Sequence, residues 1–89
     1  MIDADNTPLE FPCTFPVKAM VRTGEQGREA VLETVARHAE FSSRHDVRSR
    51  ASRNGRFESI TIEVRATSRE HLETIYAEVR ELDVVVMVL

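Results

Sequence analysis

The chain has 89 residues, 42% of them hydrophobic and 30% charged, with a formal net charge of −3, which indicates one domain with a single modest core. It has no apolar run near the ~20 residues of a membrane helix and no signal-peptide pattern at its start. The single cysteine excludes an internal disulfide, so we expect a cytoplasmic protein that is not inserted in a membrane.

The first third of the chain predicts a tail, a strand and a helix. Residues 1–8 are polar, and we expect a flexible N-terminal tail before a single domain over residues 9–89. Residues 15–22 alternate between apolar and other side chains, as in a half-buried strand. Residues 25–41 carry apolar side chains at helical spacing, which predicts the first helix.

Asn54-Gly55 lies between two alternating runs, residues 45–53 and 56–66. Asn-Gly between two such runs predicts a hairpin with a two-residue turn, in which both turn residues have positive φ. That turn fixes the register of the hairpin and places Arg50 opposite Ser59 and Ser52 opposite Phe57. The first of these strands has few apolar residues, which is typical of an edge strand.

The last third predicts a helix and a strand. Thr67 with Glu70 three residues later forms the pattern of a capping box, so we expect Thr67 to be the N-cap of a helix that runs to Leu82. Residues 84–89 form an unbroken apolar run, which predicts the final strand.

The predicted order is βαββαβ, that of an α+β ferredoxin-like sandwich. Right-handed crossovers would place both helices on one face of a four-stranded antiparallel sheet in the order 4-1-3-2. The other face would be open. Its expected side chains mix cationic and apolar groups: Lys18, Met20, Arg22, Arg48, Arg50, Phe57, Thr61, Glu63, Arg65, Val85, Met87 and Leu89.

Charge is distributed unevenly along the chain. Five arginines against one aspartate between Arg44 and Arg56 give this basic strip a charge of +4, so the other residues sum to −7. A local basic strip attracts anions, whereas the acidic remainder disfavours wrapping of a long nucleic acid. The arginines also suit an edge strand that must avoid pairing with other chains, and both interpretations remain open.

Several short segments resemble those of the YbeD-like family of small bacterial proteins. They are Leu9-Glu10-Phe11-Pro12, Phe15-Pro16 with Lys18 and Met20, Ser59-Ile60-Thr61-Ile62, Ala66-Thr67, Tyr76 and Val86-Met87-Val88-Leu89. The resemblance implies a ferredoxin-like fold, similar to small regulatory domains that bind amino acids, and a suggested link to lipoate metabolism. It supplies no catalytic residues. The chain departs from the family pattern at Val21, where glycine is usual, and at Phe57, where tyrosine is common.

These observations favour a non-enzymatic regulatory or binding module without a cofactor, present as a monomer or a weak homodimer. We expect it to bind a small anionic metabolite or a protein partner, because arginine forks suit carboxylates and phosphates. The expected binding residues, from the predicted open face and the turn beside it, are Lys18, Arg48, Arg50, Arg53, Phe57 and Arg65.

Two other functions remain as alternatives. An RNA-binding module would stack a base on Phe57, but such modules present two or more aromatic residues and a basic surface. An acylphosphatase-like enzyme would use Arg22 and Asn54 beside the glycines of the first loop, but that loop lacks the full phosphate-binding pattern. The three histidines have no metal-ligand spacing.

Overall fold

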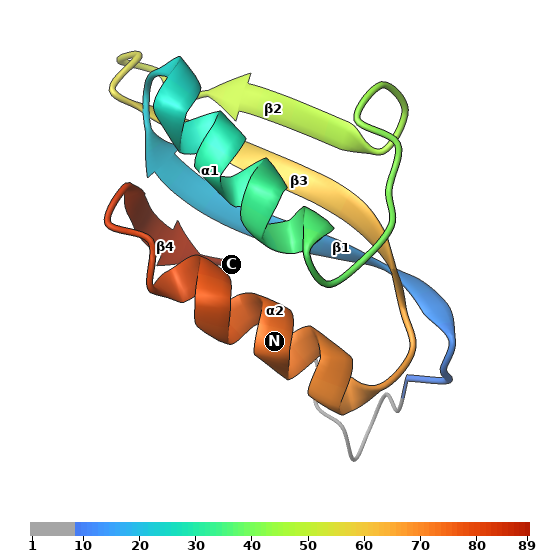
Figure 1. Cartoon of the computed structure of the whole chain (residues 1–89). Helices are drawn as coiled ribbons and strands as arrows, with labels where there is room; N and C mark the ends of the chain where they lie inside the picture. Colours follow the sequence, from blue (N-terminus) through green and yellow to red (C-terminus); the bar gives the residue numbers. More distant parts are fainter. Residues whose placement is uncertain (1–8) are drawn as a thin grey trace.

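Four strands and two helices follow one another in the order βαββαβ (Figure 1). The computed structural model describes residues 9–89, so the expected tail at residues 1–8 lies outside it. The elements are β1 (Cys13–Arg22), α1 (Glu25–Ala36), β2 (Val47–Ala51), β3 (Phe57–Ala66), α2 (Arg69–Arg80) and β4 (Val85–Val88). No helix among these residues is both long enough and apolar enough to cross a membrane.

The strands form one antiparallel sheet in the order β2-β3-β1-β4, which is the predicted order read from the other edge. Both helices cover the same face of this sheet, and the opposite face carries no helix (Figure 1). The prediction of a ferredoxin-like α+β fold is therefore confirmed.

The core lies between the sheet and the two helices, because alternate residues of the central strands β1 and β3 point toward the helices. Cys13, a free thiol at the start of β1, packs against the core from its margin. The buried apolar residues are Val17, Ala19, Val21, Val31, Val35, Ile60, Ile62, Val64, Ala66, Leu72, Ile75 and Val79.

Tyr76 of α2 closes one side of this core. Its ring meets Phe15 of β1 edge to face, with the centroids 6.5 Å apart and the planes at 89°. Burial raises the pKa of the Tyr76 phenol, while a hydrogen bond with the backbone of Lys18 acts in the opposite direction. The phenol therefore stays neutral to higher pH in the folded protein than in the unfolded chain.

Ionisation of Tyr76 should lag behind that of a free tyrosine and should destabilise the fold. Between about pH 10, where an unfolded tyrosine titrates, and the higher folded pKa, the folded state keeps a proton that the unfolded state has lost. Stability should fall as pH rises through this window. Tyr76 is the one tyrosine in a chain without tryptophan, so tyrosinate absorbance reports it directly. Equal titration midpoints of Tyr76 in the folded protein and in the denatured chain would contradict the raised pKa.

The hairpin has the predicted register and a different turn. Arg50 pairs with Ser59 as expected, and the Ser52 N–H donates to the Phe57 carbonyl at 2.7 Å. In the turn, φ is positive at Gly55 (76°) and not at Asn54, so the expected two-residue turn is wrong. The Asn54 Oδ1 instead accepts hydrogen bonds from the Arg56 N–H and the Ser52 hydroxyl, both at 3.0 Å. These side-chain bonds stabilise a longer turn that ends in a left-handed glycine.

Helix α1 ends at Ala36, five residues before its predicted end at residue 41. The Val35 carbonyl accepts bonds from the N–H groups of both His38 and Ala39, which closes the last turn. Further on, the Ser42 N–H donates to the Asp46 Oδ2 at 2.7 Å, and the Asp46 N–H donates to the Ser42 carbonyl at 2.8 Å. Local side-chain bonds of this kind compete with a helix and explain the early end.

Strand β4 contains an irregularity that the uniform apolar run of residues 84–89 did not indicate. Met20 pairs with Met87, but Val21 pairs with Val85, so one residue of β4 is extra. Val85 therefore packs against the core, and its expected place on the open face is wrong. Val86 and Met87 are 46% and 50% exposed at this edge of the sheet.

The N-cap of α2 is Ser68, not Thr67 as expected. The Ser68 hydroxyl accepts a 3.0 Å hydrogen bond from the His71 N–H. The reciprocal hydrogen bond expected from the Glu70 side chain is made by the His71 ring instead. Its Nδ1 accepts a hydrogen bond from the Thr67 N–H at 3.0 Å. The His71 Nε2 contacts the carbonyl of His38, so this one ring links the start of α2 to the end of α1.

Replacement of Ser68 by alanine should lower the free energy of unfolding by about 1 kcal/mol, because the His71 N–H loses its side-chain acceptor. Thr67→Ala is the matched control, since its hydroxyl lies a longer 3.3 Å from the His71 ring. Chemical denaturation of both variants measures the difference. An equal loss in the two variants would show that Ser68 is not the cap.

Candidate functional site

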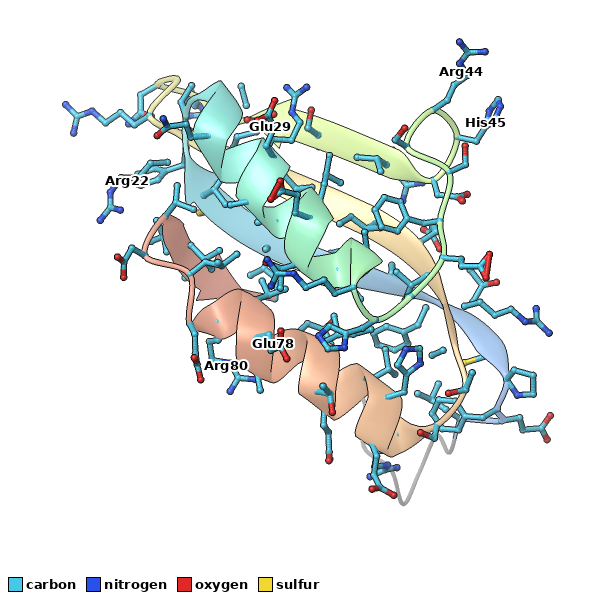
Figure 2. All side chains as sticks on the ribbon, in the orientation of Figure 1. Arg22, Glu29, Arg44, His45, Glu78 and Arg80 are labelled. Carbon is cyan, nitrogen blue, oxygen red and sulfur yellow. The ribbon has the colours of Figure 1, made fainter. Side chains whose placement is uncertain are left out.

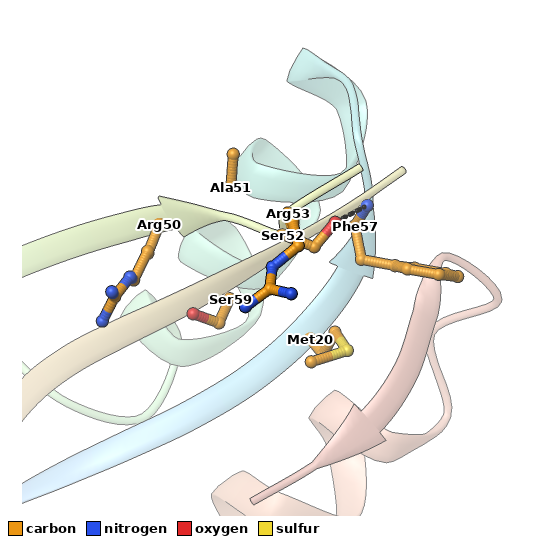
Figure 3. Close-up of a pocket in the computed structure, with 7 residues that line it drawn as sticks. All are labelled: Met20, Arg50, Ala51, Ser52, Arg53, Phe57 and Ser59. Carbon is orange, nitrogen blue, oxygen red and sulfur yellow. Dashed lines mark hydrogen bonds between the residues drawn. The ribbon is translucent and has the colours of Figure 1, made fainter. Parts of the chain in front are cut away.

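The open face of the sheet carries two neighbouring hollows. The first, which we call the Phe57 hollow, has a volume of about 440 Å³ (Figure 3). Its lining comes from β1, β2, β3 and the hairpin turn: Met20, Arg50, Ala51, Ser52, Arg53, Phe57 and Ser59. A 3.0 Å hydrogen bond from the Phe57 N–H to the Ser52 hydroxyl fixes the start of β3 against the turn.

The second hollow, which we call the Lys18 hollow, has a volume of about 460 Å³. It is lined by Lys18, Arg48, Ser49, Arg50, Ser59, Thr61 and Leu89. Arg50 and Ser59 line both hollows, so they form one continuous surface across β2, β3 and β1. The pairing of Arg50 with Ser59 in the hairpin register explains why these two residues lie at the junction.

The cations on this surface differ in their partners. The Arg48 Nη2 lies 3.1 Å from the Glu63 Oε2, so its charge is already compensated in an exposed ion pair. Such pairs add little stability, but they lower the local potential. Among the side chains that the structure describes, neither Arg50 nor Arg53 makes an ion pair. Both guanidinium groups are exposed beside the Phe57 hollow.

The structure brings together five of the six expected site residues, and Arg65 lies elsewhere. Beyond the pairing of Val47 with Ile62, β3 has no β2 neighbour, and Arg65 belongs to this uncovered end. It lines a separate hollow with the end of α1 and the start of α2, including His71. Arg65 is therefore not part of the Phe57 or Lys18 hollow, and its expected binding role stays a prediction.

Ser52 and Ser59 line the surface but were missing from the expected site. The predicted register contained a signal for both, because it placed them opposite Phe57 and Arg50. The remaining arginines of the basic strip lie outside both hollows, and Arg44 extends from the loop before β2 (Figure 2).

Residues needed for an acylphosphatase-like site are engaged in other contacts. The Arg22 Nη1 donates to the Asp83 carbonyl at 3.1 Å, and Asn54 is bound within the turn. The Thr23 hydroxyl of the same loop donates to the Gly55 carbonyl at 2.6 Å. These bonds stabilise the contact between the end of β1 and the hairpin turn. Arg22 and Asn54 therefore do not form a shared phosphate-binding site.

Features of metal and RNA sites are also weak in the described part of the chain. Residues 9–89 bring no three histidine, cysteine or acidic side chains together around a common point. The His38 Nε2 lies 2.9 Å from the Glu78 Oε1 without the alignment of a hydrogen bond, while His45 is exposed at a distant loop. Phe57 is the one aromatic side chain that lines the two hollows, so stacking of successive bases has little support.

Residues 6–89 match a family model described as a protein of unknown function, DUF493. The chain belongs to the DUF493 family. A UPF0250 protein of Neisseria gonorrhoeae is 37% identical over 91% of this chain and 89% of its own length. Another, from Vibrio parahaemolyticus, is 41% identical over 91% of this chain and 86% of its own length. The resemblance to the YbeD-like family is thereby confirmed.

A solved structure supports the fold of this DUF493 chain. It is the solution structure of a small H. pylori protein, which superposes with a TM-score of 0.70. The match covers 100% of this chain and 96% of that protein, at 20% sequence identity. At this identity the likeness concerns the fold alone.

Proposed function

We propose that this DUF493 chain is a non-enzymatic binding module that holds a small organic anion in the Phe57 hollow. The observation that carries the proposal is the position of Arg50 and Arg53 beside the apolar side chains of Met20 and Phe57. Neither arginine makes an ion pair with a side chain that the structure describes. Guanidinium groups placed next to an apolar surface suit a ligand with an apolar body and an anionic end.

The chemistry of the lining defines this ligand class more closely. An arginine binds a carboxylate or phosphate through two parallel N–H donors, which fixes the direction of approach. Met20 is unbranched and adaptable, and Phe57 offers a flat apolar face, so neither demands one exact shape. The hollow of about 440 Å³ lies within the usual range of small-molecule sites. Lipoate has the required parts, and the link suggested for the family makes it the first ligand to test.

The lining also favours binding over catalysis. The titratable side chains of the Phe57 hollow are Arg50 and Arg53, and arginine stays charged throughout the neutral range, so it does not shuttle protons. Ser52, the hydroxyl nearest to the turn, accepts from the Phe57 N–H and donates to Asn54, which leaves it poorly placed as a nucleophile. The module would act as a regulator if ligand binding changes a contact of this face with another protein. We expect this role in the cytoplasm.

A titration followed by amide NMR tests the proposal. Lipoate, octanoate and hexyl phosphate should shift the amides of Met20, Phe57 and Ser59, whereas neutral lipoamide should bind more than tenfold more weakly because it lacks the charge. Arg50→Gln with Arg53→Gln should remove the preference for the anions. Arg80→Gln, an exposed arginine on α2, is the matched control and should bind as the unmodified protein does. Failure of all three anions to bind, or equal binding of lipoamide, would disprove the proposal.

A further inference from the structure

Strand β2 is an edge of the sheet and pairs with β3 on one side (Figure 1). The hydrogen bonds at its two ends reveal which backbone groups face β3. The Glu63 N–H donates to the Asp46 carbonyl at 2.8 Å before β2, and the Ser52 N–H donates to the Phe57 carbonyl at 2.7 Å after it. Hydrogen-bonded pairs alternate along an antiparallel ladder, so Arg48 and Arg50 also direct their N–H and C=O groups to β3.

The residues between them direct their backbone groups the other way. Val47, Ser49 and Ala51 therefore present three N–H and three C=O groups along the outer edge of β2. Within residues 9–89 no element lies on that side to accept or donate these bonds. Such an edge is a template for one more strand.

Charge indicates which kind of strand would fit. Arg50 projects from the open face of β2 without an ion pair among the described side chains, and Arg48 projects beside it in an exposed pair with Glu63 that a competing carboxylate can replace. Arg44 and Arg53 flank the strand at its two ends. We propose that the outer edge of β2 accepts an extended acidic segment of a partner protein as a fifth strand. This inference shares Arg50 and Arg53 with the proposed anion site, but its first ground, the outward backbone groups of β2, does not depend on that site.

The geometry specifies a sequence pattern for the partner. In an antiparallel complex, its residues opposite Val47, Ser49 and Ala51 would form the hydrogen-bonded pairs and point to the helix side, where small or apolar side chains fit. Its residues opposite Arg48 and Arg50 would stand in the pairs with the closest side chains, where opposite charges stabilise pairing. The partner strand therefore alternates apolar and acidic residues.

A second copy of this chain is a poor occupant of the same edge. A two-fold antiparallel pairing centred on Ser49 would place Arg48 opposite Arg50 of the second copy, and like charges directly opposite each other destabilise a sheet. The mixture of free backbone groups and arginines thus selects an acidic partner over self-association.

The first test uses a capped peptide, Thr-Val-Glu-Val-Glu-Val-Thr, and a control peptide with lysine in place of both glutamates. The glutamate peptide should slow hydrogen exchange at the amides of Val47, Ser49 and Ala51. The amides of Arg48 and Arg50, already bonded to β3, should change little. Binding of the lysine peptide with equal affinity, or protection at Arg48 and Arg50 alone, would overturn the proposal.

Two variants separate strand addition from charge attraction. Ser49→Pro removes an outward N–H and no bond to β3, a position that edge strands tolerate. It should weaken binding of the glutamate peptide more than tenfold. Arg48→Glu with Arg50→Glu should reverse the preference in favour of the lysine peptide, and this result does not depend on how Ser49→Pro folds. A concentration-dependent dimer that protects the same amides without peptide would instead identify a second copy as the occupant and reject the acidic segment.

Discussion

Replacement of Ile62 by alanine should lower the free energy of unfolding by about 2–4 kcal/mol. Ile62 is fully buried on β3 and pairs with Val17 on one side and Val47 on the other. Its side chain fills the layer between the sheet and the helices, and strands fixed by pairing on both sides cannot close around the cavity left by the lost methyl groups. The loss should therefore lie well above that of a surface change.

Chemical denaturation followed by circular dichroism measures this effect. Thr61→Val is the matched control, because it changes the preceding residue on the open face while keeping a branched side chain. Its expected effect is within about 1 kcal/mol, the span of strand preferences measured in host proteins. An unchanged denaturation midpoint in Ile62→Ala would mean that Ile62 does not lie in the core.

Replacement of Gly27 by alanine should destabilise the protein by about 1–3 kcal/mol, the usual cost of overpacking. An alanine usually stabilises a helix interior by ~1 kcal/mol relative to glycine. Here, however, its Cβ would lie 3.0 Å from the Val84 Cγ2 and 3.1 Å from both the Arg22 carbonyl oxygen and the Val21 Cβ. The Arg22 carbonyl oxygen and the Val21 Cβ are fixed by the backbone of β1 and cannot rotate away.

Two companion variants test the cause of this loss. Gln26→Ala changes the exposed neighbour in the same helical turn and should leave stability within about 0.5 kcal/mol, as surface substitutions usually do. Val84→Ala removes one of the three atoms in conflict, so its combination with Gly27→Ala should cost less than the two single changes added together. Strict additivity, or a gain in stability from Gly27→Ala, would show that α1 can move away from β1.

The fold could be predicted from the sequence because its strongest signals are local and agree with one another. The alternation of residues 56–66 marks a strand with one buried face, and Asn54-Gly55 marks the turn that joins it to its neighbour. One register then follows from the spacing, and every observed β2–β3 pair conforms to it. The two helical stripes leave few alternatives for the order of the strands.

The errors occurred where a hydrogen bond or a sheet irregularity decided the outcome. The capping pattern at residues 67–70 fits two adjacent hydroxyls, and the His71 ring shifts the cap to Ser68 by taking the Thr67 N–H. In β4 the apolar run looks the same in either register, so nothing in it revealed that Val85 faces inward. These choices depend on contacts between distant segments.

The candidate site was predictable to the extent that it follows the sheet register. Lys18, Arg50 and Phe57 were expected on one face because alternate residues share a face, and they line the two hollows there. The ion pairs of these cations could not be predicted from the register. Arg48 lies opposite Thr61 in the sheet, but its ion pair is with Glu63, two residues further along β3. Arg48 was therefore expected to carry a free charge, whereas in the structure it forms an ion pair with Glu63.

The position of β1 in the sheet has a consequence for how the protein folds during synthesis. This strand is made first, but its partners in β3 begin at Phe57, and Cys13 pairs with Ala66. The ribosome must therefore release β3 before β1 can form any of these bonds, while the β2–β3 hairpin closes over a short loop. Loop closure favours the local pair, so the hairpin is the natural nucleus, and β1 joins it afterwards in the slower step.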